Sequence, residues 1–243
     1  VSFEFRAHDP KWARVWDACF VVGSLLPALL LGVAVGNAFA GIPLAANGDY
    51  AGVPLLGLIT PFTLLVGLLG CVMCLAAGSL WVALKTPIGS AIRARARKLA
   101  RVVQAFAIVL FVAVSACALM GVRPEIESAM WPLCWVFAAA FLGCVIASIY
   151  VGQARGCDLA AFVLQSAGAV FLVALLAASM FPNLVVAAPG SAGATITAAS
   201  AASSELSLAW MTGIAAIGVP LVLVYHVIVY RTFRGRLSEK DVA

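Results

Sequence analysis

Residues 206–230 of the chain are LSLAWMTGIAAIGVPLVLVYHVIVY, a stretch without Asp, Glu, Lys or Arg that lies between Glu205 and Arg231. An α-helix needs about 20 predominantly apolar residues to cross the hydrocarbon core of a membrane. The stretch therefore predicts one membrane-spanning helix. It lacks the two-residue alternation of a lipid-facing β-strand, which argues against a membrane β-barrel.

Five other uncharged runs precede this stretch, at residues 18–48, 50–84, 102–122, 128–154 and 159–204. Together the runs predict a single transmembrane domain over residues 1–243, with helices near residues 18–40, 57–84, 101–122, 130–151, 159–182 and 205–230. The composition agrees, because 64% of the residues are hydrophobic, 10% are charged and the mean hydropathy is +1.11. The predicted fold class is an all-α, polytopic transmembrane helix bundle with six crossings.

The basic residues are distributed unevenly about these predicted helices. If the helices cross the membrane in alternation, fourteen of the fifteen Lys and Arg residues lie on one side and Arg123 lies alone on the other. The fourteen are Arg6, Lys11, Arg14, Lys85, Arg93, Arg95, Arg97, Lys98, Arg101, Arg155, Arg231, Arg234, Arg236 and Lys240. Basic loops favour the cytoplasmic side, so we expect both chain ends, including the C-terminus, to be cytoplasmic. The net charge of +5 then reports topology, and the basic run from Arg93 to Arg101, expected in a short loop, requires neither a nucleic-acid nor an anionic-lipid partner.

The predicted helices carry no charged residue in their interiors. Ionisable side chains at membrane depth usually mark ion or proton pathways, so their lack argues against a proton-coupled pump. Apart from hydroxyl groups, the side chains available to line a polar cavity are Asn37, Gln104, Gln165 and His226. His226 could ligate haem or carry a proton, but the sequence offers no second ligand. The favoured interpretation is a histidine at headgroup level.

The remaining motifs indicate packing. Cys71 and Cys74 have the spacing of half a zinc site, but no second half exists, and mid-helix cysteines commonly pack as small apolar residues. Gly32 and Gly36 form a small-xxx-small pattern that lets helix backbones approach closely. No phosphate loop, nucleophile elbow or carboxylate pair is present. We therefore expect no catalytic, cofactor-binding or metal site in this chain.

Four segments carry a family resemblance when they are taken in order. They are residues 1–6 with residues 12–17 and Pro27 through Asn37; residues 58–68 with Pro61, Phe62 and Gly67; Met180-Phe181-Pro182; and Ser203, Ser204, Leu206, Leu208, Met211 and Thr212 followed by residues 230–235. These segments resemble subunit II of the cytochrome bd-type quinol oxidases. The resemblance covers essentially the whole chain and keeps the family's order and spacing.

The resemblance implies a role in an aerobic respiratory chain. Subunit II supports a haem-bearing subunit I, which oxidises quinol and reduces oxygen to water in the bacterial cytoplasmic membrane. It implies that haems b and d are held by subunit I and none by this chain. It also allows a structural quinone or lipid bound to this chain and a small single-helix subunit in the complex. Quinol and membrane lipid are the other expected partners.

The family pattern also predicts which positions matter for packing or for an interface. They are Gly36, Asn37, Pro61, Phe62, Gly67, Met180, Phe181, Pro182, Ser203, Ser204 and Met211. The family has nine crossings, so the resemblance implies that this chain is incomplete at its N-terminus. The acidic residues proposed for proton delivery in the family have no counterpart here, and residues 196–200 replace a stretch that often holds an aromatic and an Asp or Asn.

One alternative remains open at this point: a stand-alone transporter or membrane scaffold. An oxidase subunit predicts an extensive apolar interface on one side of the bundle. A transporter predicts a polar cavity between the helices, for which the sequence provides few side chains.

Overall fold

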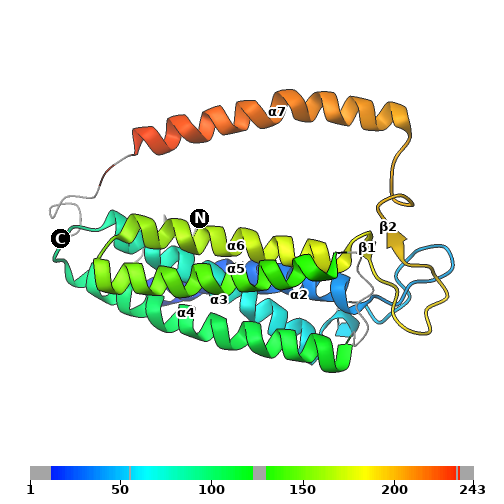
Figure 1. The fold of residues 1–243 in the computed structure, drawn as a ribbon, viewed down its shortest axis with the longest axis horizontal. Coiled ribbons are helices and arrows are strands. Elements are labelled where there is room, and N and C mark those ends of the chain that lie inside the picture. The colour runs from blue at the N-terminus through cyan, green and yellow to red at the C-terminus, as the bar shows by residue number, and fades with distance from the viewer. Residues whose placement is uncertain (1–11, 55, 123–129, 234, 236–243) are drawn as a thin grey trace.

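The computed structural model describes residues 12–54, 56–122, 130–233 and 235 (Figure 1). Residues 1–6 of the family-like segments lie outside this part of the chain, as do the basic residues Arg6, Lys11, Arg123, Arg234, Arg236 and Lys240. Six long helices are present: α2 (Ala13–Ala40), α3 (Pro61–Lys85), α4 (Ala91–Cys117), α5 (Trp131–Tyr150), α6 (Asp158–Met180) and α7 (Glu205–Thr232). Each is long and apolar enough to cross a membrane, which confirms the predicted fold class.

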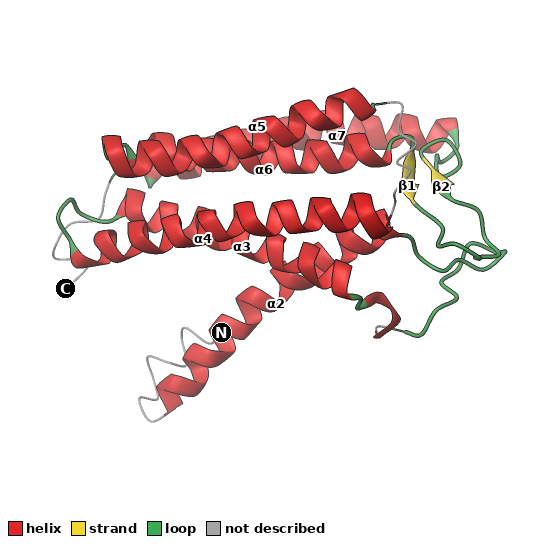
Figure 2. Cartoon of the chain, turned by 60° about the horizontal axis from the view of Figure 1, so that its bottom comes forward, coloured by secondary structure: helices red, strands yellow, loops and turns green. Residues whose placement is uncertain are grey.

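Helices α3, α4, α5 and α6 form the body of the bundle, with α5 against α6 and α3 against α4 (Figure 1). Its core is apolar and includes Met73 of α3, Ala107 and Phe111 of α4, and Phe141 of α5. Helix α2 packs on α3 through its C-terminal half, where its buried residues lie, while its N-terminal half diverges from the bundle (Figure 2).

The first turns of α3 and α4 are set by capping residues. Thr60 accepts a hydrogen bond from the backbone N–H of Thr63 at 3.2 Å, and Thr63 Oγ1 accepts one from the N–H of Thr60 at 2.8 Å. The reciprocal pair satisfies two amide donors that a helix start leaves free. Ser90 caps α4 in the same way, accepting from the N–H of Arg93 at 3.2 Å.

Three predicted helix starts differ from the structure by four or more residues. The helix expected from residue 18 begins at Ala13. The helix expected from residue 57 begins at Pro61, because residues 56–58 form a separate 3₁₀ turn before the Thr60 cap. The helix expected from residue 101 begins at Ala91 and continues through a π-helical segment, Ala118–Val122. The basic residues from Arg93 to Arg101 are therefore helical and not part of a loop. Ala, Arg and Lys are strong helix formers, and an uncharged run marks only the part of a helix inside hydrocarbon.

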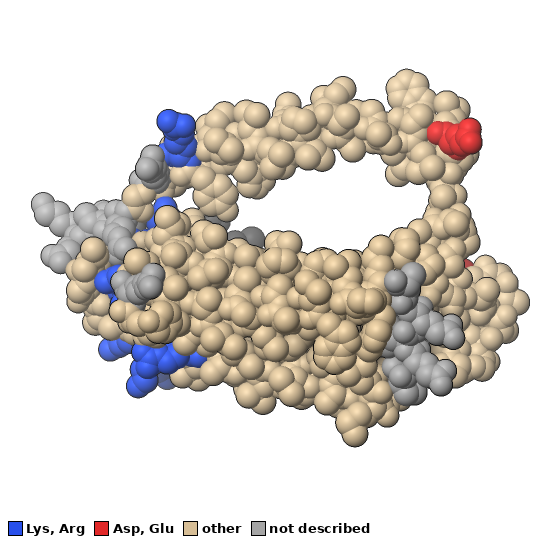
Figure 3. All heavy atoms as spheres, viewed as in Figure 1, with Lys and Arg blue, Asp and Glu red and all other residues tan. Residues whose placement is uncertain are grey.

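The loops at residues 41–60 and 181–204 meet at one end of the bundle. Strand β1 (Asn183–Val185) pairs antiparallel with β2 (Ile196–Thr197), and the N–H of Ile42 donates to the carbonyl of Val186 at 2.9 Å. The basic residues visible in Figure 3 gather at the opposite end. This separation agrees with the charge asymmetry expected from alternating crossings.

Helix α7 stands apart from the bundle. None of its residues is buried, and Figure 3 shows an opening between it and the remaining helices. At its C-terminal end, Lys85 Nζ donates to the carbonyls of Phe233 at 2.7 Å and Gly235 at 3.3 Å. The rings of Trp81 and Tyr230 meet edge to face at the same place, with centroids 6.0 Å apart. The helix is thus attached near its ends and exposed along its length.

Candidate functional site

Helices α2 and α3 cross at a contact made by glycines. A Cβ atom on Gly32 would lie 2.7 Å from the Cα of Gly67, and one on Gly36 would lie 3.1 Å from the Cα of Thr63. A side chain at Gly32 would collide with the backbone of α3, and one at Gly36 would press tightly against it, so the crossing requires glycine at position 32. The small-xxx-small pattern therefore brings α2 against α3.

Five of the residues predicted from the family pattern converge beside this crossing. Gly36 and Asn37 come from the end of α2, Phe62 and Gly67 from the start of α3, and Met180 from the end of α6. The Asn37 side chain is buried, and its Nδ2 donates to the carbonyls at positions 33 and 58, at 2.8 and 2.7 Å. It thereby fixes the loop before α3 to α2.

The other predicted residues lie elsewhere. Pro61 is the first residue of α3, and Phe181 and Pro182 follow the end of α6, with the Phe181 side chain exposed. Ser203 and Ser204 precede α7, where Ser204 accepts from the N–H at position 207 at 3.4 Å. Met211 is 61% exposed on α7. The set thus divides into an internal cluster, exposed positions at the ends of α3 and α6, and the start of the exposed helix α7.

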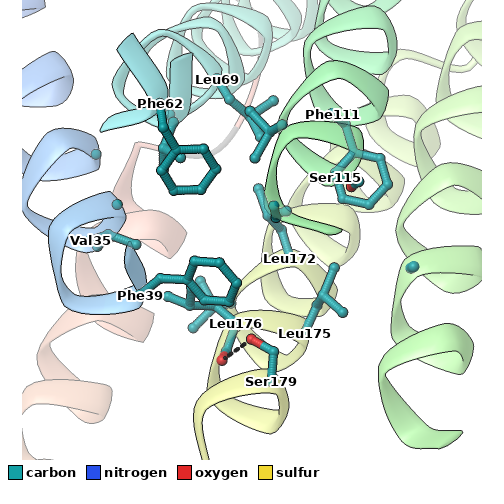
Figure 4. Close-up of a pocket in the computed structure, with 18 of the residues that line it drawn as sticks. Val35, Phe39, Phe62, Leu69, Phe111, Ser115, Leu172, Leu175, Leu176 and Ser179 are labelled. Carbon is teal, nitrogen blue, oxygen red and sulfur yellow. Dashed lines mark hydrogen bonds between the residues drawn. The ribbon is translucent and has the colours of Figure 1, made fainter. Parts of the chain in front are cut away.

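An apolar cavity of about 420 Å³ lies next to the glycine crossing, between α2, α3, α4, α5 and α6 (Figure 4). Phe39 and Phe62 face each other across one end, with ring centroids 5.9 Å apart. Leu172 and Leu176 of α6 form the wall opposite α2 and α3. Its volume falls in the range of small-molecule and cofactor sites.

The chemistry of this cavity is that of hydrocarbon. Its hydroxyl groups are those of Ser115 and Ser179, and the Ser179 hydroxyl donates to the carbonyl of Leu176 at 2.8 Å. No lining residue carries a charge. The described residues contain no group of three potential metal ligands, and His226 lies exposed on α7 with Nδ1 2.8 Å from the carbonyl of Val222. The cavity suits an acyl or isoprenoid chain and offers no histidine or carboxylate for proton transfer.

A buried polar network lies deeper in the bundle. Gln104 Nε2 is 2.8 Å from Ser148 Oγ and 2.9 Å from Gln165 Oε1, and the Ser148 hydroxyl donates to the carbonyl of Ala161 at 2.6 Å. The network joins α4, α5 and α6. Both glutamines were candidates for lining a polar cavity, but in the structure they are hydrogen-bonded to each other, and Gln104 also to Ser148.

A charged cluster lies at the basic end of the bundle, at the starts of α4 and α6 and outside their uncharged interiors. Asp158, the first residue of α6, is 3% exposed, and its Oδ2 accepts hydrogen bonds from Arg93 Nε at 3.0 Å and Nη2 at 2.7 Å. Arg97 Nε lies 3.5 Å from Oδ1. The cluster was not predicted, because both arginines were expected in a loop between two crossings. Their i, i+4 spacing was the available signal.

Comparison with known proteins agrees with the resemblance. The profile of the family described as cytochrome bd terminal oxidase subunit II matches residues 1–233. The cytochrome bd ubiquinol oxidase subunit 2 of Bacillus subtilis is 30% identical over 252 positions, covering 99% of this chain and 70% of that protein. The cytochrome bd-I ubiquinol oxidase subunit 2 of Escherichia coli K12 is 26% identical, and a probable cytochrome oxidase subunit 2 of Haemophilus influenzae is 28% identical, each covering 100% of this chain and 71% of the relative. This membrane-spanning chain therefore belongs to the cytochrome bd terminal oxidase subunit II family and is part of a quinol oxidase complex.

Proposed function

We propose that this chain is the membrane support of a haem-bearing subunit I, which holds haems b and d and carries out quinol oxidation and oxygen reduction. The observation that carries the proposal is helix α7, which is long enough to span the membrane and has no buried residue. An apolar helix in a multi-subunit complex gains packing contacts when a partner covers it. Membership of the oxidase family sets aside the stand-alone transporter.

Helix α7 offers a specific face to that partner. Ala209, Gly213 and Ala216 are spaced four and three residues apart and so lie on one side of the helix. Small residues on one side let a second transmembrane helix approach closely. We assign this side of α7 to subunit I, and regard a small single-helix subunit as a further partner of the complex.

The apolar cavity is assigned to a structural quinone or a membrane lipid. Its aromatic and aliphatic lining matches an isoprenoid tail or an acyl chain, and its hydroxyl groups are few. Such a ligand would fill space between α2, α3 and α6 and stabilise their packing. The role is structural, because the lining holds no histidine or carboxylate, and its two thiols, those of Cys74 and Cys134, lie among apolar side chains.

The orientation follows from the basic end of the bundle. Lys85 and the arginines of α4 lie at the end where α7 finishes. The positive-inside bias supports a cytoplasmic position for this end, and for the C-terminus, in a bacterial cell. A fluorescent protein fused to the C-terminus would be bright in this orientation, whereas a fused periplasmic phosphatase would be active in the opposite one.

One experiment tests the main proposal. The complex is purified through an affinity tag on this chain, and a reduced-minus-oxidised visible spectrum is recorded with the protein composition. We expect bands of haems b and d together with one copy of a larger partner. The proposal would be refuted if this chain purified alone and without colour while the haem oxidase of the same membranes eluted in a separate fraction. If subunit I, purified without this chain, retains the bands of haems b and d, then subunit I holds these haems.

A further inference from the structure

Three arginines form a stripe along the first turns of α4. Arg93, Arg97 and Arg101 are each four residues apart, so their side chains lie one above another on one side of the helix. This arginine stripe faces the connection between α5 and α6. Arg93 and Arg97 meet Asp158 there, and Arg101 Nη2 donates to Gln153 Oε1.

Among the described residues, the stripe carries more positive charge than its neighbours neutralise. Asp158 supplies one negative charge against three guanidinium groups, and like charges at i, i+4 spacing destabilise a helix. The Asp158 Oδ2 atom is already bound by two nitrogens of Arg93. Arg97 Nε and Nη2 are sealed from solvent without a hydrogen-bond partner among the described residues. These two nitrogens are out of reach of an external anion, which could approach Arg97 only through the exposed part of its side chain. The excess of positive charge in the cluster nevertheless favours an anion at that exposed part and at Arg101.

The stripe lies at the depth of lipid phosphates. The helix that begins α4 continues from residue 91 to residue 122, 32 residues or about 48 Å at 1.5 Å per residue. Its uncharged part, residues 102–122, is by itself about 30 Å long and fills the hydrocarbon core. Arg101 is therefore at the hydrocarbon edge, and Arg97 is one turn outside it, in the headgroup layer.

The remaining free space at the stripe is on the side of Arg97 and Arg101. The Arg97 side chain is 23% exposed against 13% for Arg93, and Arg101 is exposed. Below Arg101, on the same side of α4, Val109 and Val112 are exposed to lipid. A phosphate at Arg97 and Arg101 would thus have an apolar surface for acyl chains directly beneath it.

We infer that the arginine stripe binds the phosphate of an anionic membrane phospholipid, with Arg101 and the exposed part of the Arg97 side chain facing the phosphate oxygens and the acyl chains lying along α4. Guanidinium groups suit this ligand because they donate two parallel hydrogen bonds to phosphate. Basic pockets between transmembrane helices bind anionic headgroups for the same reason. The positive-inside bias accounts for basic residues at this end of the bundle, but not for three that stack on the side facing α6. A free phosphate shares the headgroup chemistry but would not use the apolar surface.

The test uses the intact complex purified through a tag on this chain. It is placed in nanodiscs of phosphatidylglycerol or of phosphatidylcholine, extracted into detergent, and analysed by native mass spectrometry for retained lipid. The matched variants are Arg101→Gln, in the stripe, and Arg95→Gln, two residues before Arg97 and on the opposite side of α4. We expect retained phosphatidylglycerol and little phosphatidylcholine, a loss of roughly tenfold in Arg101→Gln, and a change of less than about twofold in Arg95→Gln, since one bidentate charged contact is worth a factor of ten or more.

Thermal unfolding distinguishes the two sources of phosphate and controls for misfolding. Short-chain phosphatidylglycerol should raise the unfolding temperature of the wild-type complex more than that of Arg101→Gln, and inorganic phosphate at the same concentration should leave both unchanged. Equal retention of the two lipids, equal losses in the two variants, or a full stabilisation by inorganic phosphate alone would overturn the inference. These results leave the proposed support of subunit I unaffected, because the haem spectrum is read separately in each preparation.

Discussion

A Cβ atom on Gly67 of α3 would lie 2.8 Å from the carbonyl oxygen of Leu29 in α2. No real Cβ sits that close to a backbone atom without moving it. The distance between the two helix axes is therefore fixed by the hydrogen atom that Gly67 carries in place of a side chain.

Gly67→Ala should separate α2 from α3. The added methyl group would also meet Val33 Cγ2 at 2.8 Å, and overpacking of this kind costs about 1–3 kcal/mol. We expect a lower unfolding temperature and less assembled complex in detergent. Gly78→Ala is the control on the same helix, because no atom lies within 4 Å of its Cβ. A Gly67→Ala complex as stable as the control would show that α2 can shift freely.

The Gln104–Gln165 contact should give a measurable coupling energy. Interhelical hydrogen bonds in membranes are worth about 0.6 kcal/mol on average and up to about 1.7. We expect Gln104→Leu and Gln165→Leu together to cost less than the sum of the single changes, because the double change leaves neither amide unpaired. Unfolding in denaturing detergent completes the double-mutant cycle. Strict additivity of the two changes would contradict the observed 2.9 Å contact.

Asp158→Asn should destabilise the basic end of the bundle. Arg93 would lose its carboxylate, and breaking a buried ion pair costs about 3–5 kcal/mol when the other charge stays buried. Arg93 is partly exposed, and lipid headgroups lie nearby, so its remaining charge would be partly screened. We therefore expect a loss of stability at the lower limit, about 3 kcal/mol. Asp49→Asn, in an exposed loop, is the control. Hydrogen exchange should increase in the first turns of α4 and α6 and remain unchanged in the loop at residues 41–60.

Val35→Trp should fill the apolar cavity and expel its occupant. Val35 lines the cavity beside Phe39, and an indole there would take the space of an acyl or isoprenoid chain. We expect less quinone or lipid per complex by solvent extraction and chromatography. Leu30→Trp, on an exposed part of α2, provides the control. Equal extraction from both variants would place the retained molecule elsewhere.

Gly213→Leu should weaken binding of the partner subunit to α7. A leucine in the row of small residues would hold a facing helix away, whereas Gly218→Leu lies on a different side. Neither glycine has an atom within 4 Å of its Cβ in this chain alone, so folding of the chain should be the same in both variants. We expect less haem protein to co-purify with Gly213→Leu than with Gly218→Leu. Co-purification unaffected by Gly213→Leu would assign the partner to another face.

The six helices were predictable because hydrocarbon excludes charge, so each crossing appears as an uncharged run in the sequence. The start of α4 was not found by that rule, since Arg93, Arg97 and Arg101 extend the helix into the headgroup layer. Pro87, Gly89 and the Ser90 cap mark the true beginning, and helix-start signals of this kind are visible in sequence.

The internal cluster was only partly predictable. Gly36, Asn37, Phe62 and Gly67 match the family pattern, and their meeting depends on how α2 crosses α3, which local sequence does not specify. The partners of Asp158 and Gln104 come from helices distant in sequence. Such contacts are set by tertiary packing, and the pattern of a single helix cannot identify them.

The attachment of α7 has a consequence for assembly. Because Lys85 holds its C-terminal end to α3 while the loops hold its other end, the helix is already spaced from α6 before any partner arrives. A pre-positioned helix loses little rotational freedom when a second polypeptide slides in beside it. The fixed spacing between α7 and α6 therefore limits which transmembrane helices can pack there. A helix of matching width would fit closely, and a narrower one would make fewer contacts.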